Sequence, residues 1–148
     1  MKAIKIAGTF LAVLFALVLF SPTVRADDFD QMTRLTFNQP IQIPGSRVLP
    51  AGTYWFALAN HGNSPDAVVV YNADRSEVEA MLLTRPTYRT THLGRTQVTF
   101  TDQSQNSPDA LIKWFYPGTA DGHDFIYSNR TQRSLDENVS HTVIVQPD

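Results

Sequence analysis

The chain has 148 residues, of which 43% are hydrophobic and 18% charged, with no cysteine and a formal net charge of −2. The absence of cysteine excludes disulfides, thiol catalysis and cysteine-ligated metal sites. An acidic chain with scattered charges offers no basic patch of the kind that binds nucleic acid or anionic lipid.

Residues 1–26 have the layout of a secretory signal peptide. Two lysines form a positive start, Ile6–Phe20 is an uncharged apolar run, and we expect cleavage between Ala26 and Asp27. A retained membrane anchor is the alternative, but a spanning helix needs about 20 apolar residues and this run is shorter. We therefore expect a secreted or periplasmic protein with no membrane span after cleavage.

Residues 27–148 are long enough for a single domain with a modest core. Three of the 12 basic residues lie in the signal segment, so nine remain against 14 acidic residues and the domain carries a net charge of −5. Short apolar or alternating runs separated by Gly, Pro, Asn and Asp predict eight or nine short strands. Ten candidate runs supply them, in chain order 32–37, 41–43, 47–49, 54–59, 67–71, 77–83, 96–101, 110–116, 124–127 and 142–145, and the proline-flanked runs 41–43 and 47–49 can form only short edge strands.

The aromatic stretch around Trp114, with the Pro117–Gly118 turn, predicts two paired strands in the densest part of the core. Residues 85–95 are expected to be irregular, and residues 128–140 are polar with room for a short helix. No repeat or linker divides the chain. The pattern predicts one all-β domain, an antiparallel β-sandwich or a barrel-like variant of it.

Two motifs resemble those of a known family. Val48–Tyr54 reads VLPAGTY, and Ser107–Ala110 runs on to Trp114–Gly118, which reads WFYPG. Both resemble an uncharacterised family of small exported bacterial proteins of the acidobacterial type, over roughly residues 30–127. The resemblance implies secretion and a β-sandwich, and it implies no activity, cofactor or catalytic residue.

A metal site is one candidate for chemistry. Asp121, His123 and Asp124 offer two carboxylates and an imidazole beside a glycine, in a segment expected to be a loop. Calcium, however, takes six to eight oxygen ligands, and aspartate and glycine are also what any tight turn selects. A plain loop is therefore the preferred interpretation, and no cofactor is expected.

Catalysis has no sequence signature here. The four histidines stand at no recognised ligand spacing, and no G-x-S-x-G elbow is present. We therefore predict no catalytic residue. A secreted hydrolase or metal-dependent enzyme near His123 and Asp124 remains the alternative, and a pocket that gathers a histidine and carboxylates would favour it.

A binding surface is the remaining candidate. Trp55 and Trp114 are expected in the core, whereas Tyr88 in the polar segment 86–92 is the aromatic most able to face a ligand. Tyr88, Arg89 and His92 are the predicted ligand-binding residues. The leading hypothesis is thus an exported, non-catalytic protein that binds a cell-wall or extracellular polysaccharide, or an envelope protein.

Overall fold

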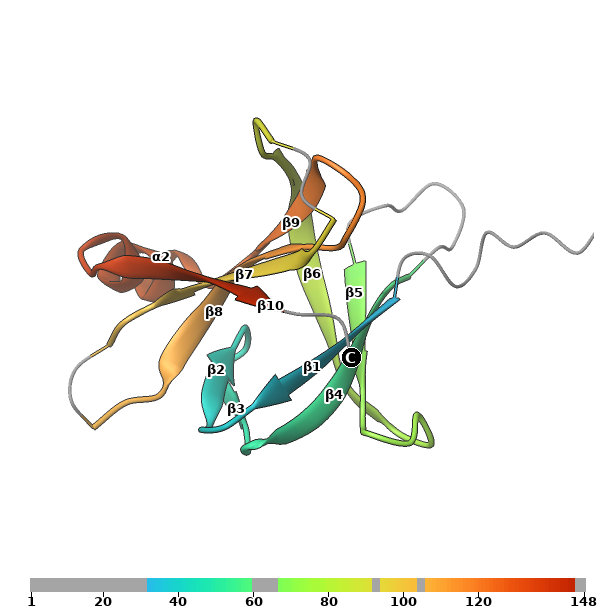
Figure 1. Cartoon of the computed structure of the whole chain (residues 1–148). Coiled ribbons are helices and arrows are strands. Elements are labelled where there is room, and N and C mark those ends of the chain that lie inside the picture. The colour runs from blue at the N-terminus through green and yellow to red at the C-terminus, as the bar shows by residue number, and fades with distance from the viewer. Residues whose placement is uncertain (1–31, 60–66, 92–93, 104–105, 146–148) are drawn as a thin grey trace, which may run out of the picture. The chain divides into compact units, whose positions relative to one another are not determined.

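The computed structural model describes residues 32–59, 67–91, 94–103 and 106–145, all of which belong to one compact unit. The predicted signal peptide and its cleavage site lie outside these residues. The described part contains ten strands and one helix (Figure 1). They are β1 (Met32–Phe37), β2 (Ile41–Ile43), β3 (Arg47–Leu49), β4 (Gly52–Leu58), β5 (Ala67–Tyr71), β6 (Val78–Tyr88), β7 (Thr96–Thr101), β8 (Asp109–Phe115), β9 (Asp121–Phe125), α2 (Asn129–Asp136) and β10 (Ser140–Val145).

The long strand β6 joins two halves of one sheet. In the first half, residues Val78–Leu83 pair with β5, which continues to β4 and β1. In the second half, residues Thr84–Tyr88 pair with β9. From β9 the sheet continues to β8, whose two edges carry β7 with β10 and β2 with β3. The β2–β8 pairing is parallel, and the other pairings of described strands are antiparallel.

The two halves face each other across an aromatic core. Phe56 of β4 lies 6.0 Å from Trp114 of β8 and 6.5 Å from Phe125 of β9, measured between ring centroids. Phe37 of β1 lies 6.1 Å from Phe100 of β7. Tilted and edge-on contacts of this kind add to the stabilisation from burying aromatic area. The sheet is not closed, because β1 pairs only with β4 among the described strands. The prediction of an all-β, antiparallel sandwich is confirmed.

Two strands are longer than the sequence predicts. Residues 85–88, expected to be irregular, belong to β6, and residues 121–123, expected in a loop, belong to β9. The two extensions pair with each other, including Pro86 opposite His123. Proline removes one ladder donor, but a five-residue pairing with β9 stabilises the extended backbone on either side of it.

The two tryptophans differ in position. Trp114 is fully buried in the core, as expected. Trp55 is half-buried on the outer face of β4, so the expectation of a core position is wrong for it. Its Nε1 donates to the Ala73 carbonyl (3.0 Å) and the Arg75 guanidinium lies 5.2 Å from its ring centroid. Alternation along β4 explains this, because the neighbouring Tyr54 and Phe56 take the inner face.

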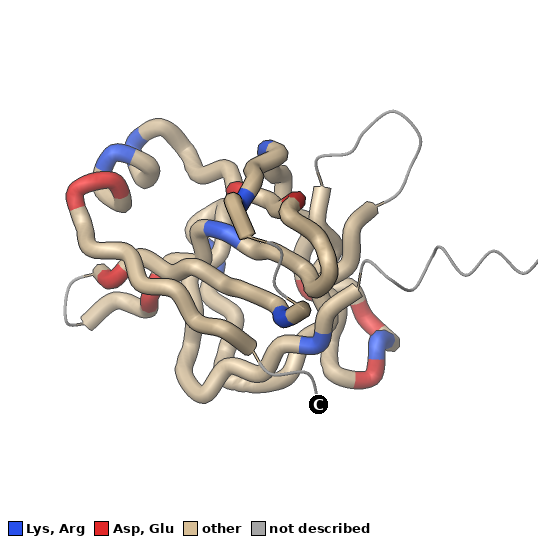
Figure 2. The backbone as a smooth tube through the Cα atoms, turned by 45° about the horizontal axis from the view of Figure 1, so that its top comes forward, with Lys and Arg blue, Asp and Glu red and all other residues tan. Residues whose placement is uncertain are grey.

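The short helix α2 covers part of the outer face of the second half. Ser128 caps its N-terminus by accepting from the Thr131 N–H, and its buried Leu135 joins the core cluster. Thr99 and Thr101 of β7 are buried, and each hydroxyl lies 3.0 Å or less from a hydroxyl of β10. Figure 2 shows basic and acidic residues interspersed along the described chain.

Candidate functional site

The predicted ligand-binding segment presents one exposed ring. Tyr88 is the last residue of β6 and its side chain is 74% exposed. Arg89 instead fixes the turn between β8 and β9: its Nη2 donates to the Thr119 carbonyl at 2.7 Å, and its guanidinium lies 5.3 Å from the Phe115 ring centroid. His92 lies outside the described residues. Tyr88 and Arg89 are adjacent in sequence, but Tyr88 is exposed to solvent whereas Arg89 is bonded to the turn between β8 and β9.

The predicted metal residues are strand residues that point in different directions. His123 is buried, stacks on Trp114 and Tyr116, and has its Nδ1 3.1 Å from the Thr84 hydroxyl. Asp124 is the next residue, so its side chain takes the opposite face of β9, where it pairs with Lys113 at 3.2 Å.

Asp121 is exposed at the start of β9 and accepts a hydrogen bond from the Thr119 hydroxyl (3.1 Å). The geometry of Asp121, His123 and Asp124 thus gives a metal site no support. In the part of the chain that the structure describes, one group of three carboxylate and imidazole side chains has its ligand atoms within 4.8 Å of one another. It consists of Asp102, Asp109 and His141.

Two members of that group, Asp109 and His141, line the mouth of a cleft between the two halves of the open sheet. The cleft has a volume of about 220 Å³ and lies between β1 and β10, with β7 beneath. Its polar end is formed by Asp109, His141 and the 38–39 segment. Its apolar walls are formed by Leu35, Phe37, Ile41, Val98, Phe100, Val143 and Val145.

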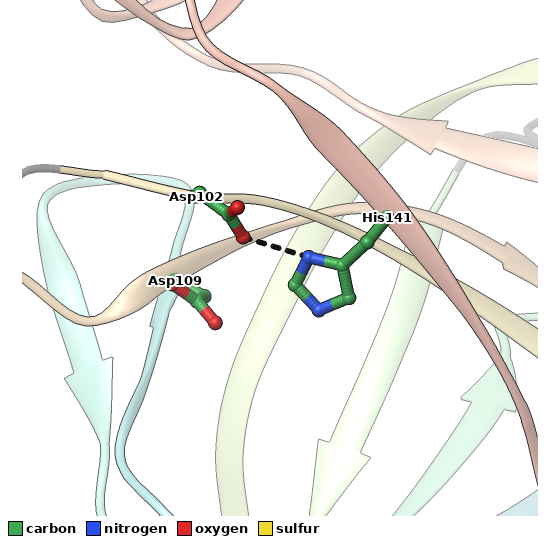
Figure 3. A group of neighbouring side chains, drawn as sticks. All are labelled: Asp102, Asp109 and His141. Carbon is green, nitrogen blue, oxygen red and sulfur yellow. Dashed lines mark ion pairs between the residues drawn. The ribbon is translucent and has the colours of Figure 1, made fainter.

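Figure 3 shows the side chains of Asp102, Asp109 and His141 gathered close together. The Nδ1 of His141 lies 2.7 Å from a carboxylate oxygen of Asp102, and the imidazole stacks on Phe100 with the ring centroids 5.6 Å apart. Asp109 accepts a weak hydrogen bond from the Gln39 amide at 3.4 Å. An ionised carboxylate can only accept, so His141 Nδ1 is the donor in this contact.

Backbone pairing holds these residues in place. The antiparallel register of β7 and β10 sets His141 opposite Phe100, two residues before Asp102. The Asp102 N–H donates to the Val139 carbonyl (2.9 Å), which ties the end of β7 to the start of β10. Asp109 is the first residue of β8 and pairs with Ile41 of β2. Rigid strands therefore position all three polar groups.

The chemistry of the mouth is that of an acceptor site. The Asp109 carboxylate and the His141 imidazole line the polar end of the cleft, Asp102 is bonded to that imidazole, and the walls of the cleft are apolar. Among the described residues that line the cleft, the one hydroxyl is that of Thr36, which lies 3.0 Å from the Thr53 hydroxyl.

Comparison of the chain with protein-family models, with curated proteins and with solved structures gives no match. The resemblance to an exported family consequently stays a prediction. No helix in the described residues has the length and apolar character needed to cross a membrane.

Sequence reasoning missed the cleft. His141 stood among four histidines with no ligand spacing, and Asp102 and Asp109 are 39 and 32 residues from it. The one usable signal was the β-branched, largely apolar run of residues 142–145 immediately after a histidine. It places His141 on a strand, but it does not say which strand lies beside it.

Proposed function

We propose that this is an exported, non-catalytic binding protein whose ligand occupies the cleft between β1 and β10. The ligand class is a small molecule with an apolar body and a positively charged nitrogen. The observation that carries the proposal is the clustering of Asp102, Asp109 and His141, the last two of which line the mouth of an apolar cleft. Ligand pockets in general combine apolar walls with a few convergent polar groups.

The apolar walls favour a small, compact body. The volume of about 220 Å³ is below the roughly 300–1,000 Å³ usual for drug-sized ligands. Seven aliphatic or aromatic side chains line it. Because Val143 is 44% exposed at the rim, a bound ligand would also cover apolar surface that is now open to water.

The polar mouth favours an ammonium group. An ammonium ion carries donors and no acceptor, which matches the Asp109 carboxylate. It would leave the bond between Asp102 and His141 intact. A divalent metal ion has a weaker case, because three protein ligands leave most of a calcium shell unfilled and because Asp102 is already bonded to the imidazole. A hydrogen bond from an ammonium group to the Asp109 carboxylate would join two charged groups, and such bonds are roughly twice as strong as neutral ones.

A set of six-carbon ligands with different head groups tests the proposal. Hexylamine, hexanol and hexanoate share one apolar body, and calorimetric titration compares their dissociation constants. We expect hexylamine to bind most tightly. Asp109→Asn should weaken hexylamine about tenfold or more, as expected for a hydrogen bond to a charged group, with Asp121→Asn as the matched control. If hexanol binds as tightly as hexylamine, the proposed head group is wrong. If none of the three binds, the cleft is not a ligand site.

A secreted or periplasmic location is part of the proposal, supported by the composition of residues 1–26. Fractionation of the native host, with N-terminal sequencing of the recovered protein, should give a chain that begins at Asp27. A full-length chain in the cytoplasmic fraction would contradict it.

The polysaccharide version centred on Tyr88 retains one supporting observation, the 74% exposure of that ring. Co-sedimentation with peptidoglycan and insoluble polysaccharides tests it, since Tyr88→Ala should then abolish pelleting. The enzyme alternative near His123 and Asp124 has less support, because these side chains lie on opposite faces of β9.

A further inference from the structure

A second cavity lies between α2 and the outer face of the sheet's second half. Its volume is about 520 Å³, within the range of small-molecule sites. Polar side chains of the sheet and of the helix segment face each other across it, in contrast to the apolar cleft between β1 and β10. They include Arg85, Lys113, Asp124, Gln132, Asp136 and Asn138.

The floor of this cavity carries an alternating row of charges. Asp124 of β9 is paired in register with Lys113 of β8 on one side and with Arg85 of β6 on the other. The Lys113 Nζ lies 3.2 Å from the Asp124 carboxylate, and each of these two side chains is 39% exposed. Opposite charges on adjacent strands stabilise one another. The row is therefore fixed in place and open to solvent.

The helix side of the cavity supplies donors and acceptors in close proximity. The Gln132 amide donates to the Asp136 carboxylate at 2.8 Å, one turn apart on α2. With Arg85 and Lys113 on the floor, the cavity lining holds two cationic and two anionic side chains. Its formal charge is zero, so it favours neither an anion nor a cation.

We propose that this cavity binds a neutral saccharide. Each sugar hydroxyl both donates and accepts hydrogen bonds, which suits a lining that alternates guanidinium, ammonium, carboxylate and amide groups. Hydrogen bonds to charged side chains are the stronger ones. The partly buried Ile112 also lines the cavity and offers apolar contact to the C–H face of a sugar ring.

This site is separate from the cleft between β1 and β10. Adjacent residues of β10 serve the two cavities: Ser140 lines the one beneath α2, and His141 lines the cleft. Successive strand residues point to opposite faces of a sheet. A ligand in one cavity therefore does not contact the other, and the saccharide proposal does not depend on the proposed amine ligand.

Nuclear magnetic resonance titration with glucose, cellobiose and chitobiose tests the proposal, with glucuronate and glucosamine as charged comparisons. We expect a neutral sugar to shift the side-chain amide signals of Gln132 and Asn138 in the wild-type protein. Lys113→Gln and Gln132→Ala should each weaken that sugar about fivefold or more, as loss of one hydrogen bond predicts. Tyr88→Ala and Asp109→Asn should leave its affinity unchanged.

Three outcomes would overturn the proposal. One is the absence of amide shifts at Gln132 and Asn138 with every neutral sugar. Another is a charged sugar that binds more tightly than its neutral counterparts. The third is loss of sugar binding in Tyr88→Ala alone, which would place the saccharide at the exposed ring. The wild-type amide shifts do not depend on the folding of any variant.

Discussion

The ring of Phe115 lies directly against the backbone of Gly122, where β8 and β9 run side by side. A Cβ atom at position 122 would overlap three carbons of that ring. The Arg89 guanidinium also lies over the ring, 5.3 Å from its centroid. The ring is 4% exposed and has little room to move away, so the site fits glycine alone without rearrangement.

We expect Gly122→Ala to lower the free energy of unfolding by about 1–3 kcal/mol, the usual cost of adding a group to a well-packed site. Urea unfolding followed by fluorescence measures it. Gly94→Ala is the matched control, since a Cβ there meets no atom within 4 Å, and should change stability by no more than about 0.5 kcal/mol. Equal effects of the two variants would contradict the packing described here.

A second prediction concerns Tyr127, whose hydroxyl lies 2.9 Å from the Leu111 carbonyl and 3.1 Å from that of Gln42. Burial raises the pKa of Tyr127 well above its ordinary value of 10.0. The folded state therefore holds the phenolic proton more tightly than the unfolded chain. The resulting stability is fully present below pH 10 and is lost as the pH rises above it.

The unfolding free energy of the wild type should accordingly fall between pH 9 and 11, and Tyr127→Phe should reduce that dependence. At neutral pH the variant should lose about 1 kcal/mol, the net value of a typical buried hydrogen bond. Tyr88→Phe, at an exposed position, is the control. An identical alkaline dependence in wild type and Tyr127→Phe would contradict the assignment.

A third prediction separates a structural from a metal-binding role for β9. His123 is buried against Trp114 and Thr84, so His123→Ala should cost about 2–5 kcal/mol, as other large-to-small core changes do. Asp124→Asn breaks a partly exposed ion pair with Lys113 and should cost about 1 kcal/mol or less. Neither variant should change the metal content of the purified protein. A metal ion that is present in the wild type and lost in both variants would contradict a purely structural role for His123 and Asp124.

A fourth prediction concerns the turn between β5 and β6. The Asp74 carboxylate accepts hydrogen bonds from the Ser76 hydroxyl (2.7 Å) and the Ser76 N–H (3.1 Å), and these lower the pKa of Asp74 below 3.8. The stability from this group is present above pH 3.8 and is lost as the pH falls through the lowered value. Ser76→Ala should raise the Asp74 pKa measured by nuclear magnetic resonance. An unchanged titration would contradict the hydroxyl contribution.

Much of the fold follows from local patterns. Alternation and turn residues predict Ala67–Tyr71 and Thr96–Thr101 with the bounds that the structure has. The prediction fails where pairing between distant segments decides the conformation. The predicted strand ended at residue 83 with residues 85–95 expected to be irregular, and Asp121 with Gly122 suggested a turn, yet the two segments stabilise each other as paired strands.

The cleft could not be predicted for a related reason. His141 meets Asp102 because β10 pairs with β7, and both meet Asp109 because β7 also pairs with β8. These pairings are set by the packing of the whole core, and no motif spans them. The α2 cavity has the same origin, since Asp124 acquires two cationic neighbours from β6 and β8.

The sharing of β6 between both halves of the sheet has a consequence for insertions. A residue added between Leu83 and Thr84 would turn one part of the strand over relative to the other, because side chains alternate with a period of two. Either Ala80 and Leu82 would leave the core of the first half, or Thr84 would lose its place beside His123. This one peptide junction therefore fixes the phase in which the two halves meet.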